Sequence, residues 1–128
     1  MKFLLDTNVL SLVARLHRKA TERYEKHLEE CSIPAVVWHE LRHGVQKMKS
    51  GAIKRQFLDF YDTLALPILP YDRVAAEFHA SERARIRSSK YADGQIAAIA
   101  VTRGLTLVTA NTSDFKAFRD LRLEDWSR

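Results

Sequence analysis

The stretch that decides the fold is residues 3–8, which read FLLDTN. Phe3 to Leu5 form a short, continuous apolar run, and Asp6, Thr7 and Asn8 end it with polar side chains. Continuous apolar runs of this kind fit a strand that is buried on both faces, as in a parallel sheet. We therefore expect a buried parallel strand with a carboxylate directly after its last residue.

Strands and helices are expected to alternate along the rest of the chain. Further strands are predicted over residues 32–33, 66–70, 105–109 and 121–123. Helices are predicted over residues 9–16, 21–31, 34–48, 53–65, 72–86 and 91–103, with Asp72 as an N-cap. This alternation predicts an α/β protein, a three-layer α/β/α sandwich with a central, mostly parallel sheet, formed by residues 1–128 as one domain.

The composition limits the class of protein. Of the 128 residues, 46% are hydrophobic and 29% are charged, as in soluble globular proteins. No apolar run reaches membrane-spanning length, and the single cysteine, Cys31, excludes an intramolecular disulfide and a cysteine-rich zinc site. We expect a cytoplasmic protein with no membrane partner.

The chain has 21 Lys and Arg residues against 16 Asp and Glu residues. This excess of positive charge favours a polyanionic partner, although many proteins are mildly basic without one.

Four acidic residues lie at the ends of apolar strand-like runs or on or beside the apolar sides of predicted helices: Asp6, Glu40, Asp93 and Asp114. In open parallel sheets, ligands bind beyond the carboxyl ends of the strands, near the topological switch point. Asp6 follows one predicted strand directly, and Asp114 lies in the polar loop after another. Buried carboxylates are costly unless something neutralises them. Four that converge would suit a hard divalent cation bound through oxygen.

Helical geometry places the two acids that lie on helices. Glu40 lies on the flank of an apolar stripe, about 60° around the helix from Val37. Asp93 lies among the small and apolar residues of 92–100, which admit close approach. Plainer roles stay open: Asp6 as a helix cap, Glu40 as a surface side chain, Asp93 as a partner of the helix dipole and Asp114 as a turn residue.

Residues 39–43, HELRH, match the H-E-x-x-H zinc motif of metalloproteases. On a helix, however, His39 and His43 lie opposite the apolar stripe and are expected to point to solvent. A third ligand at a familiar spacing is also missing. We therefore expect the match to be incidental, with a zinc protease as a less favoured alternative. His17 and His27 are expected to be surface histidines.

Four segments in consistent order resemble the PIN-domain ribonucleases: residues 4–8, 40–44, 92–100 and 107–115. Within that group the chain resembles the VapC toxins, especially the FitB-like branch, and its ending, residues 121–126, is similar to theirs. The similarity spans nearly the whole chain. One departure is Ala110, where many relatives have Asn or Arg.

The resemblance implies a metal-dependent endoribonuclease that is the toxin of a toxin–antitoxin pair. Its cofactor would be Mg²⁺ or Mn²⁺, and a metal-activated water would hydrolyse RNA and leave a 5′-phosphate. The implied catalytic and metal-binding residues are Asp6, Glu40, Asp93 and Asp114, and the supporting residues are Thr7, Asn8, Thr109 and Asn111. The implied partners are an RNA substrate, a VapB-like antitoxin and further copies of the chain, in homodimers and toxin–antitoxin hetero-oligomers.

An acidic site that cleaves RNA needs basic surroundings, because carboxylates repel phosphates. Arg83, Arg85, Arg87 and Lys90 lead toward Asp93 and are candidate RNA contacts; Arg15, Arg18 and Lys19 form a second group. Either group could also be a solvated helix face.

Two other functions stay open: a catalytically silent RNA-binding or regulatory module, and a phosphatase of the haloacid dehalogenase type. The phosphatase would need a second Asp where Asn8 stands.

Overall fold

The computed structural model describes residues 1–128, and its centre is one five-stranded sheet. The strands are β1 (Phe3–Leu5), β2 (Cys31–Pro34), β3 (Ile68–Leu69), β4 (Thr106–Val108) and β5 (Arg122–Glu124). Their spatial order is β3-β2-β1-β4-β5, and every neighbouring pair is parallel. The predicted parallel sheet is confirmed.

Six α-helices and two short 3₁₀ helices connect the strands. They are α1 (Thr7–Ala14), α2 (Arg18–Lys26), η1 (Leu28–Glu30), α3 (Ala35–Gln46), α4 (Ala52–Thr63), α5 (Arg73–Arg85), α6 (Tyr91–Thr102) and η2 (Thr112–Phe115). The predicted helix over 21–31 is wrong in its bounds. α2 begins at Arg18 because the side chain of His17 accepts a hydrogen bond from the N–H of Ala20, and the chain has entered β2 by Cys31.

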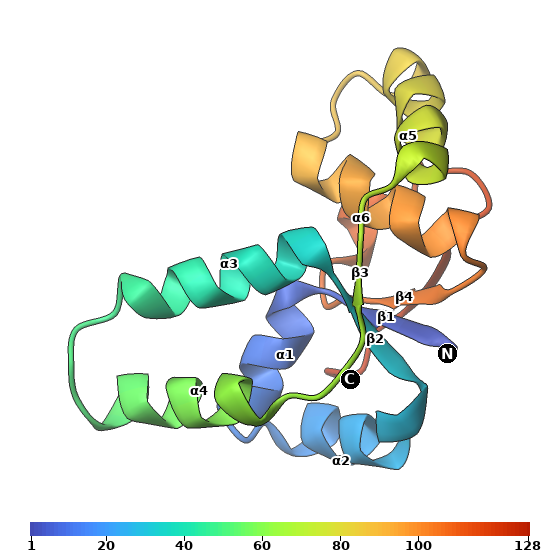
Figure 1. Ribbon diagram of the computed structural model, residues 1–128. Coiled ribbons are helices and arrows are strands. Elements are labelled where there is room, and N and C mark those ends of the chain that lie inside the picture. The colour runs from blue at the N-terminus through green and yellow to red at the C-terminus, as the bar shows by residue number, and fades with distance from the viewer.

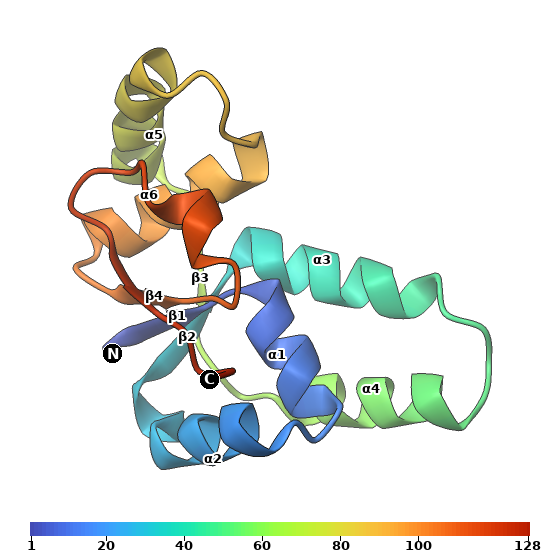
Figure 2. The same ribbon diagram turned by 180° about the vertical axis from the view of Figure 1, so that it is seen from behind.

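The helices are placed on both faces of the sheet, as the predicted three-layer arrangement requires (Figures 1 and 2). α5 and α6 pack together on one side, and α1 and α2 pack together on the other. α3 and α4 contact each other and extend away from the sheet as an arm. None of the helices is long and apolar enough to cross a membrane.

The central strands are buried because helices cover both of their faces. All three residues of β1 and of β4 are buried, which explains the continuous apolar run of residues 3–5. Trp126 packs edge-on against Phe3, with ring centroids 5.1 Å apart, and stacks on His27 at 5.5 Å. His27 is therefore a partly buried packing residue and His17 a helix cap, so the expectation that both are plain surface histidines is wrong.

Candidate active site

The candidate site lies at the carboxyl edge of the sheet, where β1 and β4 end side by side. The parallel register pairs Leu5 with Val108. The main-chain N–H of Asp6 donates to the carbonyl of Val108 at 3.0 Å. The next residues, Asp6 and Thr109, are thus held close together. β1 lies between β2 and β4 in the sheet, at the point where the strand order reverses direction, which is where open parallel sheets bind ligands.

Asp6 uses both oxygens of its carboxylate. Oδ1 accepts from the main-chain N–H of Thr7 at 2.8 Å and thereby caps α1. Oδ2 accepts from the hydroxyl of Thr109 at 2.9 Å and from the side-chain amide of Asn8 at 3.4 Å. The side chain is only 7% exposed. The helix-cap explanation is correct, and the same carboxylate also links β1 to the end of β4.

Asn8, Thr109 and Asn111 complete a polar network between the two strand ends. The Asn8 side chain donates to the Thr109 hydroxyl at 3.2 Å and accepts from the N–H of Ala110 at 2.9 Å. The N–H of Asn111 donates to the Thr109 hydroxyl at 3.1 Å. Asn8 and Thr109 therefore support Asp6 through their side chains. Asn111 takes part through its main chain, and its side chain does not cap η2.

Glu40 reaches the same edge of the sheet from α3. Its Oε2 accepts a hydrogen bond from the Thr7 hydroxyl at 2.8 Å, and the side chain is half-buried. The predicted position on the flank of the apolar stripe is confirmed, because Val37 and Leu41 are buried beside it. Thr7 thus joins α1 to α3 and fixes one oxygen of Glu40.

Asp93 and Asp114 line a common hollow of about 240 Å³. Asp93 lies in the first turn of α6, and Asp114 lies in η2, four residues beyond the network around Thr109 and Ala110. Lys90 and Ser113 line the same hollow. Asp93 is half-buried, whereas Asp114 is exposed.

The four carboxylates form one electrostatic cluster with Asp93 in the middle. Burial raises the pKa of Asp93, repulsion from Asp114 raises it further, attraction to Lys90 lowers it, and repulsion from Glu40 raises it. Its pKa therefore lies above the ordinary value.

Asp6 has a raised pKa for similar reasons. Burial is the largest cause, the hydrogen bonds from Thr109 and Thr7 act in the opposite direction, and the charges of Asp93 and Glu40 add to the rise. All four predicted acids are thus brought together from four separate elements. No group of three or more Asp, Glu, His or Cys side chains is close enough to hold a metal ion by itself.

The basic residues predicted to contact RNA divide into three side chains without an ion-paired acidic partner and one, Arg85, that is held by an ion pair. Lys90 lines the hollow of Asp93 and Asp114, and Arg87 is exposed in the segment that leads to it. Arg83 lies over the ring of Tyr91 at 5.1 Å and is exposed.

Arg85 is different, because its guanidinium donates two hydrogen bonds to Glu82 and one to the carbonyl of Ala117. Arg85 is therefore occupied by a structural contact and is a weaker candidate for RNA than its neighbours.

Two buried polar residues of α5 support the site and were missed in the sequence. Glu82 is 2% exposed and accepts from Arg85 and from the main-chain N–H of Arg119, so it ties α5 to the segment after η2. Hydrogen bonds from Arg85 are the largest cause of its lowered pKa; burial acts in the opposite direction, and Arg119 lowers it further. Glu82 lies seven residues after buried Ala75, and this helical spacing was the signal that could have found it.

His79 is the second of these residues. It is buried, bonds to the Tyr71 hydroxyl at 2.8 Å, and packs on α6 where Gly94 has no side chain. A Cβ atom at position 94 would collide with the imidazole ring. The small residues near Asp93 do admit a close approach, as predicted, and the group that approaches Gly94 is His79.

Comparison with known proteins agrees with this geometry. The family model described as the PIN domain matches residues 3–121. The chain belongs to the PIN-domain family. The tRNA(fMet)-specific endonuclease VapC of Shigella flexneri is 30% identical over 132 residues, which cover 99% of each chain. Toxin FitB of Neisseria gonorrhoeae is 33% identical over 89% of this chain and 91% of its own.

A solved relative shows the same fold. The crystal structure of DNA-bound VapBC from Salmonella typhimurium superposes with a TM-score of 0.85 at 30% identity and covers 98% of each chain. The resemblance to VapC and FitB proteins is therefore confirmed for this PIN-domain chain.

Proposed function

We propose that this PIN-domain protein is an endoribonuclease and the toxin of a toxin–antitoxin pair, and that it hydrolyses RNA phosphodiester bonds with the help of Mg²⁺ or Mn²⁺. The observation that carries the proposal is the convergence of four carboxylates, one directly after β1 and the others from α3, α6 and η2, at the switch point of the sheet. The names of the relatives, which describe VapC endonucleases and ribonucleases, support RNA as the substrate.

The residues fit a hard divalent cation. Their donor atoms are carboxylate oxygens, and both burial and repulsion between neighbouring carboxylates raise the pKa of Asp6 and of Asp93, so a bound cation would stabilise their charged forms. A dense cage of ligands is not required, because Mg²⁺ keeps several waters and uses few carboxylates together with substrate phosphate. Asp6 and Asp93 would be the principal ligands, directly or through water, with Glu40 and Asp114 completing the site. When bound, the ion would supply an activated water and neutralise charge that develops on the phosphate.

The remaining polar residues orient these acids. Thr109 and Asn8 hold Asp6, and Thr7 holds Glu40, so each carboxylate keeps a defined direction before substrate arrives. Lys90, beside Asp93, is the cation best placed to contact a substrate phosphate. Arg87 could contact the next phosphate along the strand.

The proposed partners follow from the solved relatives, which are complexes of VapC or FitB with their antitoxins. We expect a VapB-like antitoxin for this chain, together with homodimers and toxin–antitoxin hetero-oligomers. A hollow of about 270 Å³ between α1, α3 and α4, partly lined by apolar side chains, includes Glu40 in its wall. An apolar segment inserted there would cover one of the four carboxylates and block the site.

The test is cleavage of a single-stranded RNA by the purified protein with Mg²⁺, with EDTA, and with Mg²⁺ restored after EDTA. We expect cleavage that is lost with EDTA and recovered with the ion, and products with 5′-phosphate ends. Asp93→Asn, purified in parallel, controls for contaminating nucleases and is expected to be inactive. Unchanged cleavage in EDTA would contradict the metal mechanism, and RNA binding without cleavage would favour the silent RNA-binding module.

A further inference from the structure

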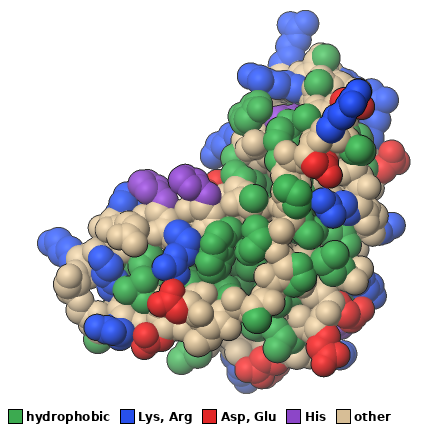
Figure 3. Space-filling model, in the orientation of Figure 1, with side chains coloured by type: hydrophobic (Ala, Val, Ile, Leu, Met, Phe, Trp, Pro, Cys, Tyr) green, Lys and Arg blue, Asp and Glu red, His purple; other side chains and the backbone are tan.

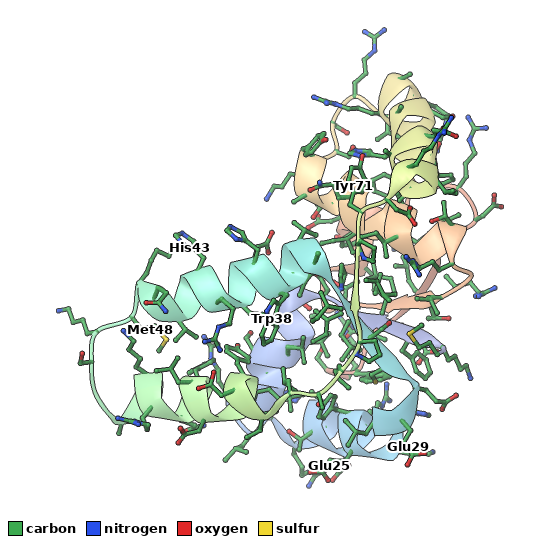
Figure 4. The ribbon with its side chains drawn as sticks, in the orientation of Figure 1. Glu25, Glu29, Trp38, His43, Met48 and Tyr71 are labelled. Carbon is green, nitrogen blue, oxygen red and sulfur yellow. The ribbon has the colours of Figure 1, made fainter.

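The motif that the proposed function leaves unused is the pair His39 and His43 on α3. Residues four apart on a helix lie on one face in neighbouring turns. Both side chains are exposed, as predicted, and their rings are nearly parallel, with centroids 6.0 Å apart and an interplanar angle of 2°. Figure 3 shows neighbouring histidine side chains at the surface of the α3 arm, and Figure 4 shows His43 on the side of α3 that faces away from α4.

These two rings have no structural partner, which sets them apart from the other histidines of the chain. His17 caps α2, His27 stacks on Trp126, and His79 bonds to Tyr71. The neighbouring charged side chains of α3 are already engaged, because Glu40 is bonded to Thr7 and Arg42 is paired with Asp62 of α4 at 2.8 Å. The nitrogen atoms of His39 and His43 are therefore free to bind a ligand from solution.

We propose that His39 and His43 form a two-imidazole site for a borderline transition-metal cation of the Zn²⁺ class. Imidazole nitrogen suits Zn²⁺, Ni²⁺ and Cu²⁺, whereas Mg²⁺ prefers oxygen. With Zn–N bonds of about 2.1 Å, two coordinated rings have centres about 5 Å apart, so rotation of the exposed side chains from their 6.0 Å separation is sufficient. Once one imidazole binds, the other is already at high effective concentration.

The site differs in chemistry and position from the acidic cluster. Glu40 lies between the two histidines in sequence, but its Oε2 atom is bonded to Thr7 at the edge of the sheet. Cys31, the one thiol of the chain, is buried in β2 and cannot take part. Two protein ligands and water would make an open site that exchanges its ion, in contrast to a closed structural zinc site.

The experiment is calorimetric titration of the full-length, untagged protein with ZnCl₂ in excess MgCl₂, which is added to compete for the carboxylate oxygens of the acidic cluster. The matched control exchanges two exposed side chains of α3, as His43→Gln with Gln46→His. This variant keeps the composition but moves the histidine pair from a spacing of four residues to seven, too far apart to share an ion. Circular dichroism and thermal unfolding confirm that the variant folds.

We expect one Zn²⁺ per chain for the native sequence, and binding at least about tenfold weaker for the exchanged variant and for His43→Ala. The proposal is overturned if the native chain binds no Zn²⁺ under these conditions. It is equally overturned if the exchanged variant binds as tightly as the native chain, because the acidic cluster or another group would then hold the ion. The readout is metal binding, so the outcome does not depend on the proposed ribonuclease activity.

Discussion

Asp6 shows how one side chain can serve the fold and the proposed chemistry together. Its carboxylate caps α1 and also accepts from Thr109 at the end of β4, so it is fixed from two directions. The charge that these bonds hold in place is repelled by Asp93 and Glu40. Such a position favours binding of a cation over stability of the isolated protein.

The first prediction concerns Asp93→Asn, which removes the carboxylate in the middle of the cluster. We expect cleavage to fall to background, while the metal-free variant unfolds a few degrees above the native protein because repulsion is relieved. The pKa of Asp93 is raised on folding, so its contribution to stability is present below its unfolded value near 3.8 and is lost as the pH rises through the folded pKa. Thermal unfolding in EDTA across the acidic range tests this; equal or lower stability of Asp93→Asn near neutral pH would contradict it.

The second prediction concerns Thr7, whose hydroxyl holds Oε2 of Glu40 at 2.8 Å. Thr7→Val keeps the shape and removes the hydroxyl, and we expect cleavage to fall by about 10–100-fold, as is typical when a supporting group is lost. Thr7→Ser, which retains the hydroxyl, should keep most of the activity. The Mg²⁺ concentration that gives half-maximal cleavage should rise for Thr7→Val only. The same loss in both variants would show that the methyl group matters and the hydrogen bond does not.

At the scale of elements, α5 holds the loop that carries Asp114. Glu82 accepts from the N–H of Arg119 at 2.6 Å and from Arg85, which also donates to Ala117. These contacts fix the segment immediately after η2, and with it the wall of the hollow shared by Asp93 and Asp114. The buried carboxylate of Glu82, which lies outside the acidic cluster, thus helps to position Asp114, which belongs to it.

The third prediction concerns Glu82→Gln, which leaves Arg85 with a neutral partner. We expect the free energy of unfolding to fall by about 1–3 kcal/mol, because charged hydrogen bonds are weakened in a buried position. Glu77→Gln on the same helix is the matched control, since Glu77 and its partner Arg73 are exposed, and we expect a change below about 0.5 kcal/mol. Denaturant unfolding measures both values. A similar small effect for the two variants would show that the Glu82 contacts do not stabilise the fold.

Glu82 and Asp93 contribute to the stability of the fold with opposite pH dependence. The folded-state pKa of Glu82 is lowered, so its stabilising effect is present above the unfolded value near 4.5 and is lost as the pH falls through the folded pKa. The difference in stability between the native protein and Glu82→Gln should therefore shrink in acid.

The local pattern of apolar and polar residues predicted most strands and helices. The features that it did not predict depend on contacts between residues far apart in the sequence. The run FLLDTN predicted β1 and the possible helix cap at Asp6, because both features depend on neighbours in sequence. The end of α2 was misplaced because the apolar character of Leu28 and Cys31 fits a helix as well as η1 and β2. The bond from Thr7 to Glu40 spans 33 residues, and no local signal could predict it.

At the scale of the molecule, the acidic cluster is an exception in a basic protein with a net charge of +5. The surrounding positive charge favours RNA, and the cluster provides the place where a cation can join carboxylate to phosphate.

The fourth prediction follows from linkage between metal binding and folding. A ligand that binds only the folded state raises the unfolding temperature with its concentration. We expect Mg²⁺ and Mn²⁺ to stabilise the native protein, and to have little effect on Asp93→Asn at the same ionic strength set with KCl. Equal stabilisation of both proteins would indicate that the cations bind elsewhere.

The packing of His79 on Gly94 also restricts how this sequence can vary. A methyl group at position 94 has no room while an imidazole occupies the adjoining helix, so Gly94→Ala alone should damage the packing beside Asp93. A smaller residue at 79 would make that room. In related chains the two positions should therefore change together, and a double substitution should recover part of what the single one loses.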